Sequence, residues 1–134
     1  MSLELRRQRA IDYVNQLPTG AIDESACVPN WTSWSLGGGD ISRDLFRKVL
    51  KDMMSLFPAG FKIWVIETTA EEDRVAVKAK SEGILVNGTR YANDYIFTFK
   101  FEGDLISHCC EFADSKHIAD VLIPVLGAQL AGWK

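Results

Sequence analysis

Residues 90–114 read RYANDYIFTFKFEGDLISHCCEFAD and predict two long antiparallel strands joined by a turn at residues 102–104. Side chains alternate between the two faces of a strand, so every second residue of the first arm shares a face. A Gly-Asp pair between two strand-forming runs is a strong hairpin signal. One face of the first arm is largely aromatic, and its members are Tyr91, Asn93, Tyr95, Phe97, Phe99 and Phe101.

The second arm of the hairpin carries an acid, Glu111. By alternation Glu111 shares a face with Leu105, Ser107 and Cys109, while His108 faces the other way. A carboxyl group in an apolar cavity loses hydration, and this raises its pKa toward neutrality. Such a group can exchange protons near neutral pH, so Glu111 is the leading catalytic candidate. The alternative interpretation is an ordinary strand glutamate paired with a lysine or an arginine.

The composition predicts a single cytoplasmic domain over residues 1–134. A chain of 134 residues buries enough surface for one core. The net charge of −3, from 15 basic and 18 acidic residues, argues against nucleic-acid and membrane partners. Residues 1–20 lack the apolar core of a signal peptide, and no run approaches the roughly 20 apolar residues of a membrane span. Three cysteines, an odd number, fit free thiols in a reducing compartment.

Two amphipathic helices are predicted before the strands. The first covers residues 3–17, with Tyr13 at the edge of its apolar stripe. Residues 21–36 are expected to form an irregular loop, in which two tryptophans fold over something apolar. The second helix begins after Asp40 or Ser42, either of which can cap it, and it continues to about residue 57.

Three features of the chain could suggest a cofactor or a metal, and none of them favours one. The glycine run at residues 37–39 lacks the Lys-Ser/Thr of a P-loop and the spacing of a dinucleotide fingerprint, so it is interpreted as a turn. The methionines of the second helix are interpreted as core, because methionine fills gaps beneath sheets. His108 and His117 are far apart and have no Cys-x-x-Cys nearby, which does not favour zinc. The sequence therefore predicts no cofactor and no metal.

The remaining segments complete an α+β pattern. Strands are predicted at residues 61–69, 74–82 and 84–86, and the tail at residues 115–130 has helical spacing with a break near Pro124 and a final apolar segment. We expect Asp114 to cap the tail helix and the apolar tail to be buried on the sheet or on a partner subunit. Helices followed by antiparallel strands predict helices on one side of a sheet, and a curved sheet over helices favours a ligand cavity.

This order of elements and the hairpin motifs resemble the SnoaL-like branch of the nuclear transport factor 2-like superfamily. The resemblance covers nearly the whole chain and implies a cone-shaped α+β fold, with a curved mixed or antiparallel sheet wrapped around N-terminal helices. The family contains polyketide cyclases, steroid isomerases, epoxide hydrolases, dehydratases and non-catalytic members, so the fold does not determine an activity. The motifs have the forms Gly-x-x-Tyr-x-Asn-x-Tyr-x-Phe-x-Phe and Ile-x-x-x-x-Glu-Phe-x-Asp, carried by Gly88, Tyr91, Asn93, Tyr95, Phe97 and Phe99, then by Ile106, Glu111, Phe112 and Asp114.

The resemblance also implies roles for individual residues. Polyketide ester cyclases and limonene-epoxide hydrolases place an aspartate acid or base on the last long strand, where this chain has Glu111. Steroid isomerases use a tyrosine of the first helix in an oxyanion hole, and Tyr13 resembles it. The two other acids of those isomerases would fall around residues 34–37 and at about Phe97, and the Arg-x-Asp of the epoxide hydrolases would fall at residues 80–83. This sequence has none of those three groups.

The sequence predicts a protein that binds a small hydrophobic molecule, and two functions are left open. One is a cofactor-independent acid/base isomerase, cyclase, dehydratase or hydrolase, in which Glu111 exchanges the proton while Tyr13 and Asn93 stabilise a developing oxyanion. The other is a non-catalytic module that binds a ligand or dimerises. We expect a homodimer formed through the outer face of the sheet and the apolar tail. The predicted pocket-lining residues are Trp31, Trp34, Met53, Phe57, Tyr95, Phe97 and Cys109.

Overall fold

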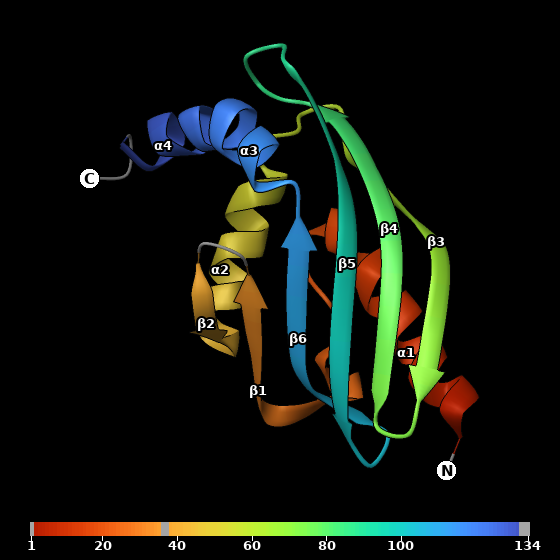
Figure 1. Ribbon diagram of the computed structural model, residues 1–134. Coiled ribbons are helices and arrows are strands. Elements are labelled where there is room, and N and C mark those ends of the chain that lie inside the picture. The colour runs from red at the N-terminus through yellow and green to blue at the C-terminus, as the bar shows by residue number, and fades with distance from the viewer. Residues whose placement is uncertain (1, 36–37, 132–134) are drawn as a thin grey trace.

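A computed structural model describes residues 2–35 and 38–131 (Figure 1). Within those ranges the strands form one mixed, curved sheet in the order β2-β1-β6-β5-β4-β3. The pairing is antiparallel except between β1 and β6, which are parallel. The elements are α1 (Leu3–Gln16), 3-10 turns at Leu17–Thr19 and Glu24–Ala26, β1 (Cys27–Ser35), β2 (Gly39–Ser42), α2 (Arg43–Met54), β3 (Phe61–Glu71), β4 (Arg74–Ile84), β5 (Arg90–Glu102), β6 (Leu105–Ala113), α3 (Ser115–His117), a π-helical turn (Ile118–Leu122) and α4 (Ile123–Ala131).

The predicted hairpin is confirmed as the pair β5 and β6. Glu102 and Leu105 are partners across a two-residue turn, and Gly103 in that turn has a φ of 61°, in the left-handed region that favours glycine. The alternating burial of β5 is also as predicted, because its six odd-numbered residues from Tyr91 to Phe101 are all buried. This face of β5 forms the centre of the concave side of the sheet.

The face assignment on β6 needs one correction. The register between β5 and β6 shifts at a bulge that includes Ser107, and the extra residue inverts the alternation. As a result Ile106 is buried on the face of Cys109 and Glu111. The prediction that Leu105 and Ser107 share that face is therefore wrong. Glu111, as predicted, lies on the same face of the sheet as the aromatic residues of β5.

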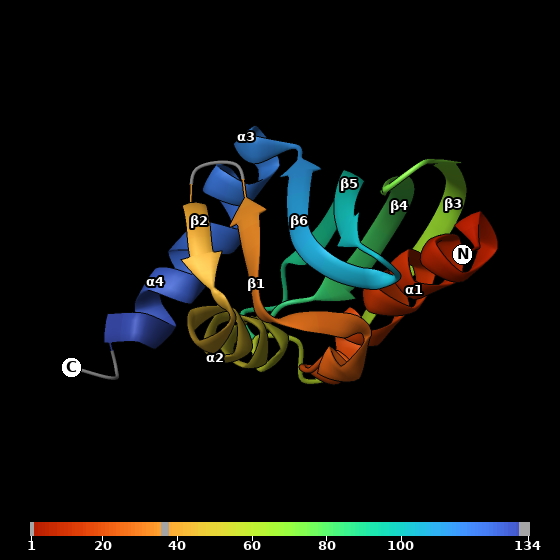
Figure 2. The same cartoon turned by 90° about the horizontal axis from the view of Figure 1, so that it is seen from below.

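Figure 2 shows the curvature of the sheet, with α1 and α2 on its concave side. On α1 the apolar stripe buries Ala10, Tyr13 and Val14 against the aromatic residues of β5. The helix α2 begins at Ser42, whose hydroxyl accepts a hydrogen bond from the Leu45 amide at 3.3 Å. Of the two predicted caps, Ser42 is therefore the one used. The helices and the concave face enclose the core.

The prediction of an irregular loop at residues 21–36 is wrong. Cys27–Ser35 is a strand, β1, which pairs with β6 on one side and with β2 on the other. Pro29 argued against a strand in the sequence, because proline has no amide hydrogen to donate to a neighbouring strand. It falls in the interval where the register between β1 and β6 is irregular. Of the predicted glycine turn, Gly37 lies outside the described residues, and Gly39 begins β2.

The chain after β6 is helical to the end of the described part, and the predicted break near Pro124 is wrong. Pro124 is the second residue of α4 and follows the π-helical turn Ile118–Leu122, so the missing proline amide falls where the helix changes from π to α geometry. The Asp114 side chain caps α3, as predicted. The prediction of a strand at residues 84–86 is also wrong, since β4 ends at Ile84. The final segment to Trp133 extends beyond the described residues.

Candidate functional site

A cavity of about 540 Å³ lies between the concave face of the sheet, α2 and the C-terminal helices. This volume falls within the usual range for small-molecule sites. The lining is mainly apolar, and its few polar groups come from the strands and from the start of α3. These polar residues are Ser33, Ser35, Tyr91, Tyr95, Glu111 and Ser115.

Helical spacing explains why α2 forms one wall of the cavity. The residues of α2 on the cavity lie at spacings of three and four, which puts them on one face of the helix: they are Phe46, Val49, Leu50, Met53 and Met54. At the opposite end, the segment from Ser115 to Leu126 contributes a second apolar stripe. The cavity is therefore lined by two helical segments that are far apart in the sequence.

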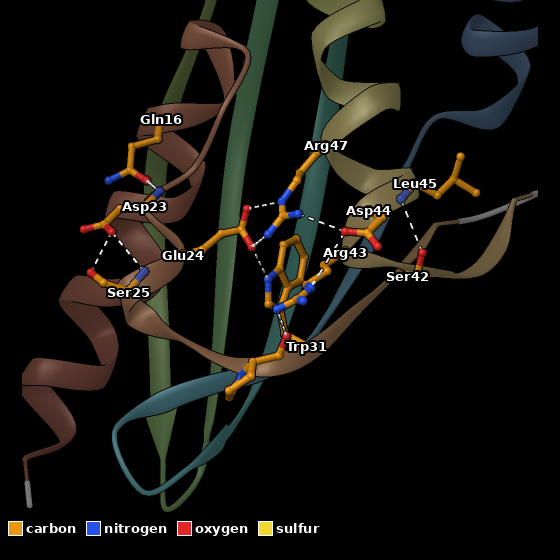
Figure 3. Close-up of polar contacts among 11 residues, drawn as sticks. Gln16, Asp23, Glu24, Ser25, Trp31, Ser42, Arg43, Asp44, Leu45 and Arg47 are labelled. Carbon is orange, nitrogen blue, oxygen red and sulfur yellow. Dashed lines mark hydrogen bonds and ion pairs between the residues drawn. The ribbon is translucent and has the colours of Figure 1, made fainter.

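A polar clamp holds α2 against the sheet (Figure 3). The Glu24 carboxylate accepts two hydrogen bonds from the Arg47 guanidinium, at 2.6 and 2.7 Å, and one from the Trp31 indole at 3.0 Å. The Arg47 hydrogen bond, followed by that of Trp31, lowers the pKa of Glu24 and keeps it ionised. Paired bonds of this kind fix orientation as well as distance. The clamp thus positions the apolar face of α2 over the cavity.

Glu111 lies on the cavity wall, on the central strand β6. Its register partners are Phe97 on β5 and Ser35 on β1, and both also line the cavity. No described residue forms an ion pair or a hydrogen bond with its carboxyl group, in contrast to the alternative interpretation of an ion-paired glutamate. Loss of hydration raises the pKa of Glu111 to about 7. The site therefore holds a carboxyl group that can be protonated or ionised near neutral pH.

Five of the residues predicted for the site come together on the cavity. Glu111 lies on β6, Tyr95 and Phe97 lie on β5, Met53 lies on α2, and Phe57 follows α2. The period of two along the strands and the period near 3.6 along the helix were sufficient signals for these residues.

Three other predicted residues lie in the core and do not line the cavity. Tyr13 packs against Phe99 with ring centroids 5.1 Å apart, and its hydroxyl interacts with the Cys109 thiol. Trp31 packs against Phe46, with centroids 5.0 Å apart. Burial raises the pKa of Tyr13 and of Cys109 well above their ordinary values. The oxyanion role predicted for Tyr13 stays a prediction.

The prediction that Trp34 lines the pocket is wrong. Trp34 lies on the convex face of the sheet, where its ring is 5.1 Å from that of Phe112. The cause is alternation along β1, which directs Ser33 and Ser35 into the cavity and the residue between them outward. Ser33 and Ser35 were missed because this segment was not recognised as a strand.

Asn93 and Tyr91 form a pair beside the cavity. Asn93 is buried and does not line the cavity, but its side-chain amide donates to the Tyr91 hydroxyl at 2.9 Å. Tyr91 itself lines the cavity. The alternation of β5 could have identified Tyr91 as a site residue, because it shares the face of Tyr95 and Phe97.

The two histidines lie away from the cavity wall. His108 is on the convex face, with Nδ1 2.7 Å from the Thr32 hydroxyl, and His117 accepts a hydrogen bond from the Ala92 amide at 3.3 Å. In the part of the chain that the structure describes, no group of three or more His, Cys, Asp and Glu side chains is arranged to hold a metal. In the same part, every helix is too short or too polar to cross a bilayer.

A curved six-stranded mixed sheet over N-terminal helices is the nuclear transport factor 2-like (NTF2-like) fold, and the chain has this α+β fold. Similar solved structures include an NTF2-like protein from Anabaena variabilis ATCC 29413, with 21% identity over 83% of this chain and 87% of that chain and a TM-score of 0.71. The BvnE pinacolase from Penicillium brevicompactum has 17% identity over 87% of each chain and a TM-score of 0.76. A putative SnoaL-like polyketide cyclase from Jannaschia sp. CCS1 has 14% identity over 92% of each chain and a TM-score of 0.74.

The predicted SnoaL-like and NTF2-like resemblance is confirmed by these structures at the level of the fold. No family model matches the sequence, and no curated protein matches it. One fold can host unrelated activities, so function must be argued from the site itself.

Proposed function

We propose that this protein binds a small hydrophobic molecule in its cavity and catalyses an acid/base reaction on it without a cofactor. The observation that carries the proposal is the Glu111 carboxyl group on an apolar wall, which has no partner among the described residues and a pKa raised to about 7. A proton donor or acceptor works best when its pKa is close to the working pH. Perturbed carboxyl groups in cavities are also typical of catalytic sites.

The reaction class is an isomerisation, cyclisation, dehydration or hydrolysis. Each of these needs a proton to be taken from one position of the substrate or delivered to another, which is the step that Glu111 can perform. A fold shared with a pinacolase and with a putative polyketide cyclase is compatible with this class.

The free cysteines Cys27, Cys109 and Cys110 support the expected reducing, cytoplasmic location.

The test is a pH titration of the Glu111 carboxyl carbon by NMR, with the signal assigned by its loss in Glu111→Gln. The expected midpoint is about 7, and it should move when 2-acetylnaphthalene, an apolar ketone, enters the cavity. A midpoint near the ordinary value of 4.5, together with no response to the ketone, would contradict the proposal.

A second candidate function is a non-catalytic module that binds a ligand and dimerises. The observation that favours it is a set of large apolar side chains exposed on the convex face of the sheet, Trp64, Ile66, Ile96 and Phe112. Exposed apolar patches commonly mark interaction sites, so we propose a homodimer through this face in either case. A Glu111 titration at the ordinary pKa would leave the non-catalytic function as the better account.

A further inference from the structure

Four side chains of β4 and β5 form two hydrogen-bonded pairs at the edge of the cavity. The hydroxyls of Ser81 and Tyr95 are 2.8 Å apart, and the Asn93 amide nitrogen is 2.9 Å from the Tyr91 hydroxyl. The two tyrosines are neighbours, and each influences the pKa of the other. Tyr91 and Tyr95 line the cavity, whereas Ser81 and Asn93 are buried behind them.

The orientation of the Asn93 side chain sets the direction of its hydrogen bond with Tyr91. Its Oδ1 accepts hydrogen bonds from the backbone amides of Asp94, at 2.8 Å, and Asp114, at 2.9 Å. The Nδ2 group must therefore face Tyr91, and an amide NH₂ can only donate. Consequently the Tyr91 oxygen receives a proton from Asn93, and the proton of its own hydroxyl must go elsewhere.

A count of protons shows that the tyrosines have donors to spare. The hydroxyls of Ser81, Tyr91 and Tyr95 carry three protons, and the hydrogen bond between Ser81 and Tyr95 uses one. The Tyr91 proton has no acceptor among the described residues, because the Asn93 Nδ2 group only donates and Glu111 accepts no hydrogen bond from them. Hydroxyl groups rotate, so when Ser81 donates to Tyr95 the Tyr95 proton is also free to face the cavity. A buried donor without an acceptor is costly.

We infer that the hydroxyls of Tyr91 and Tyr95 bind an acceptor oxygen of the ligand, so the ligand is an apolar molecule that carries a carbonyl or a similar oxygen. This inference rests on the proposed function, because it concerns the same cavity. Asn93 acts as a positioning residue, because it keeps the Tyr91 oxygen occupied and directs the Tyr91 proton elsewhere.

The register of the hairpin puts this acceptor site within reach of Glu111. Phe97 pairs with Glu111 and Tyr95 pairs with Ala113, so Tyr95 and Glu111 are diagonal neighbours on the concave face. Diagonal neighbours on adjacent strands are separated by roughly 7–8 Å between Cα atoms, which is less than the length of a two-ring ligand. A ligand held by its oxygen at the tyrosines would therefore place an adjacent carbon near the Glu111 carboxylate.

The test compares two probes of nearly the same shape. 2-Acetylnaphthalene carries a carbonyl oxygen, and 2-isopropenylnaphthalene carries a CH₂ group in its place. Dissociation constants are measured at about pH 9, where Glu111 is ionised and can only accept hydrogen bonds. The quantity of interest is the selectivity for the ketone, expressed as the ratio of the two dissociation constants in each variant.

The proton count predicts a specific order among the variants. Tyr91→Phe with Tyr95→Phe removes both donors on the cavity and should lower the ketone selectivity about tenfold. Ser81→Ala is the matched control, because it removes a neighbouring hydroxyl and leaves the protons of both tyrosine hydroxyls without an acceptor among the described residues. It should keep the wild-type selectivity, and each single tyrosine variant should keep most of it.

Two outcomes would overturn the inference. One is an unchanged selectivity in the double variant, and the other is a loss in Ser81→Ala as large as in the double variant. If the double variant does not fold, the carbonyl stretching frequency of the ketone bound to the wild type is measured instead. A hydrogen bond should lower this frequency relative to that of the ketone dissolved in hexane. An unshifted band would overturn the inference. Failure of both probes to bind would instead contradict the proposed function, and with it the inference.

Discussion

Replacement of Glu111 with glutamine should stabilise the folded protein at alkaline pH and have much less effect at acid pH. In the cavity, loss of hydration raises the pKa of Glu111 from an ordinary value of 4.5 to about 7. The two values differ by about 2.5, and one pKa unit corresponds to about 1.36 kcal/mol, so the ionised side chain lowers the free energy of unfolding by about 3 kcal/mol. Glutamine carries no charge and avoids this cost.

The sign follows from the protons bound by the two states. Below about pH 4.5 both the native and the unfolded chain hold the proton, so ionisation has no cost. Between about 4.5 and 7 the native state keeps a proton that the unfolded state has released, and the free energy of unfolding falls as the pH rises. Above about 7 both states are ionised and the full cost is present.

The assay is urea unfolding followed by tryptophan fluorescence, at about pH 4 and about pH 8.5. The difference in unfolding free energy between Glu111→Gln and the wild type should grow by about 3 kcal/mol from the lower to the higher pH. Comparing two pH values cancels any constant cost of the new amide group. Glu67→Gln is the control, because Glu67 is an exposed strand glutamate and surface changes alter stability by less than about 0.5 kcal/mol. A difference that is equal at both pH values would refute the desolvation of Glu111.

Two further predictions concern the convex face and the end of the cavity. Phe112→Glu places a charge in the exposed apolar patch and should convert the proposed homodimer to a monomer in sedimentation equilibrium. The control Leu45→Glu, at an exposed position on α2, should leave the dimer intact. A dimer that persists in Phe112→Glu would exclude this interface. Gly83→Ala should lower the free energy of unfolding by about 1–3 kcal/mol, because the added methyl carbon would lie 2.7 Å from Cδ1 of Phe57. Unchanged urea unfolding of Gly83→Ala would show that the Phe57 ring moves freely into the cavity.

Much of the fold could be predicted from the sequence because it depends on neighbours along the chain. The Gly103-Asp104 turn joins β5 and β6 directly. The alternation of β5 identifies its buried face, and Glu111 of β6, the partner of Phe97, lies on the same face. The same reasoning located Met53 on the cavity side of α2, since the apolar spacing of a helix shows which face is buried. Turn chemistry and side-chain period are local, so no distant contact is needed to recognise them.

Other features were decided only by the tertiary structure. Residues 27–35 become a strand because they pair with β6, about 75 residues later in the chain, and that pairing turns Trp34 away from the cavity. The bulge at Ser107 is likewise a property of two paired strands. The absence of a partner for Glu111 among the described residues depends on every element around the cavity. Pairing, burial and hydrogen bonding between distant segments set these features, whereas the sequence by itself determined the hairpin, its aromatic face and the candidate acid.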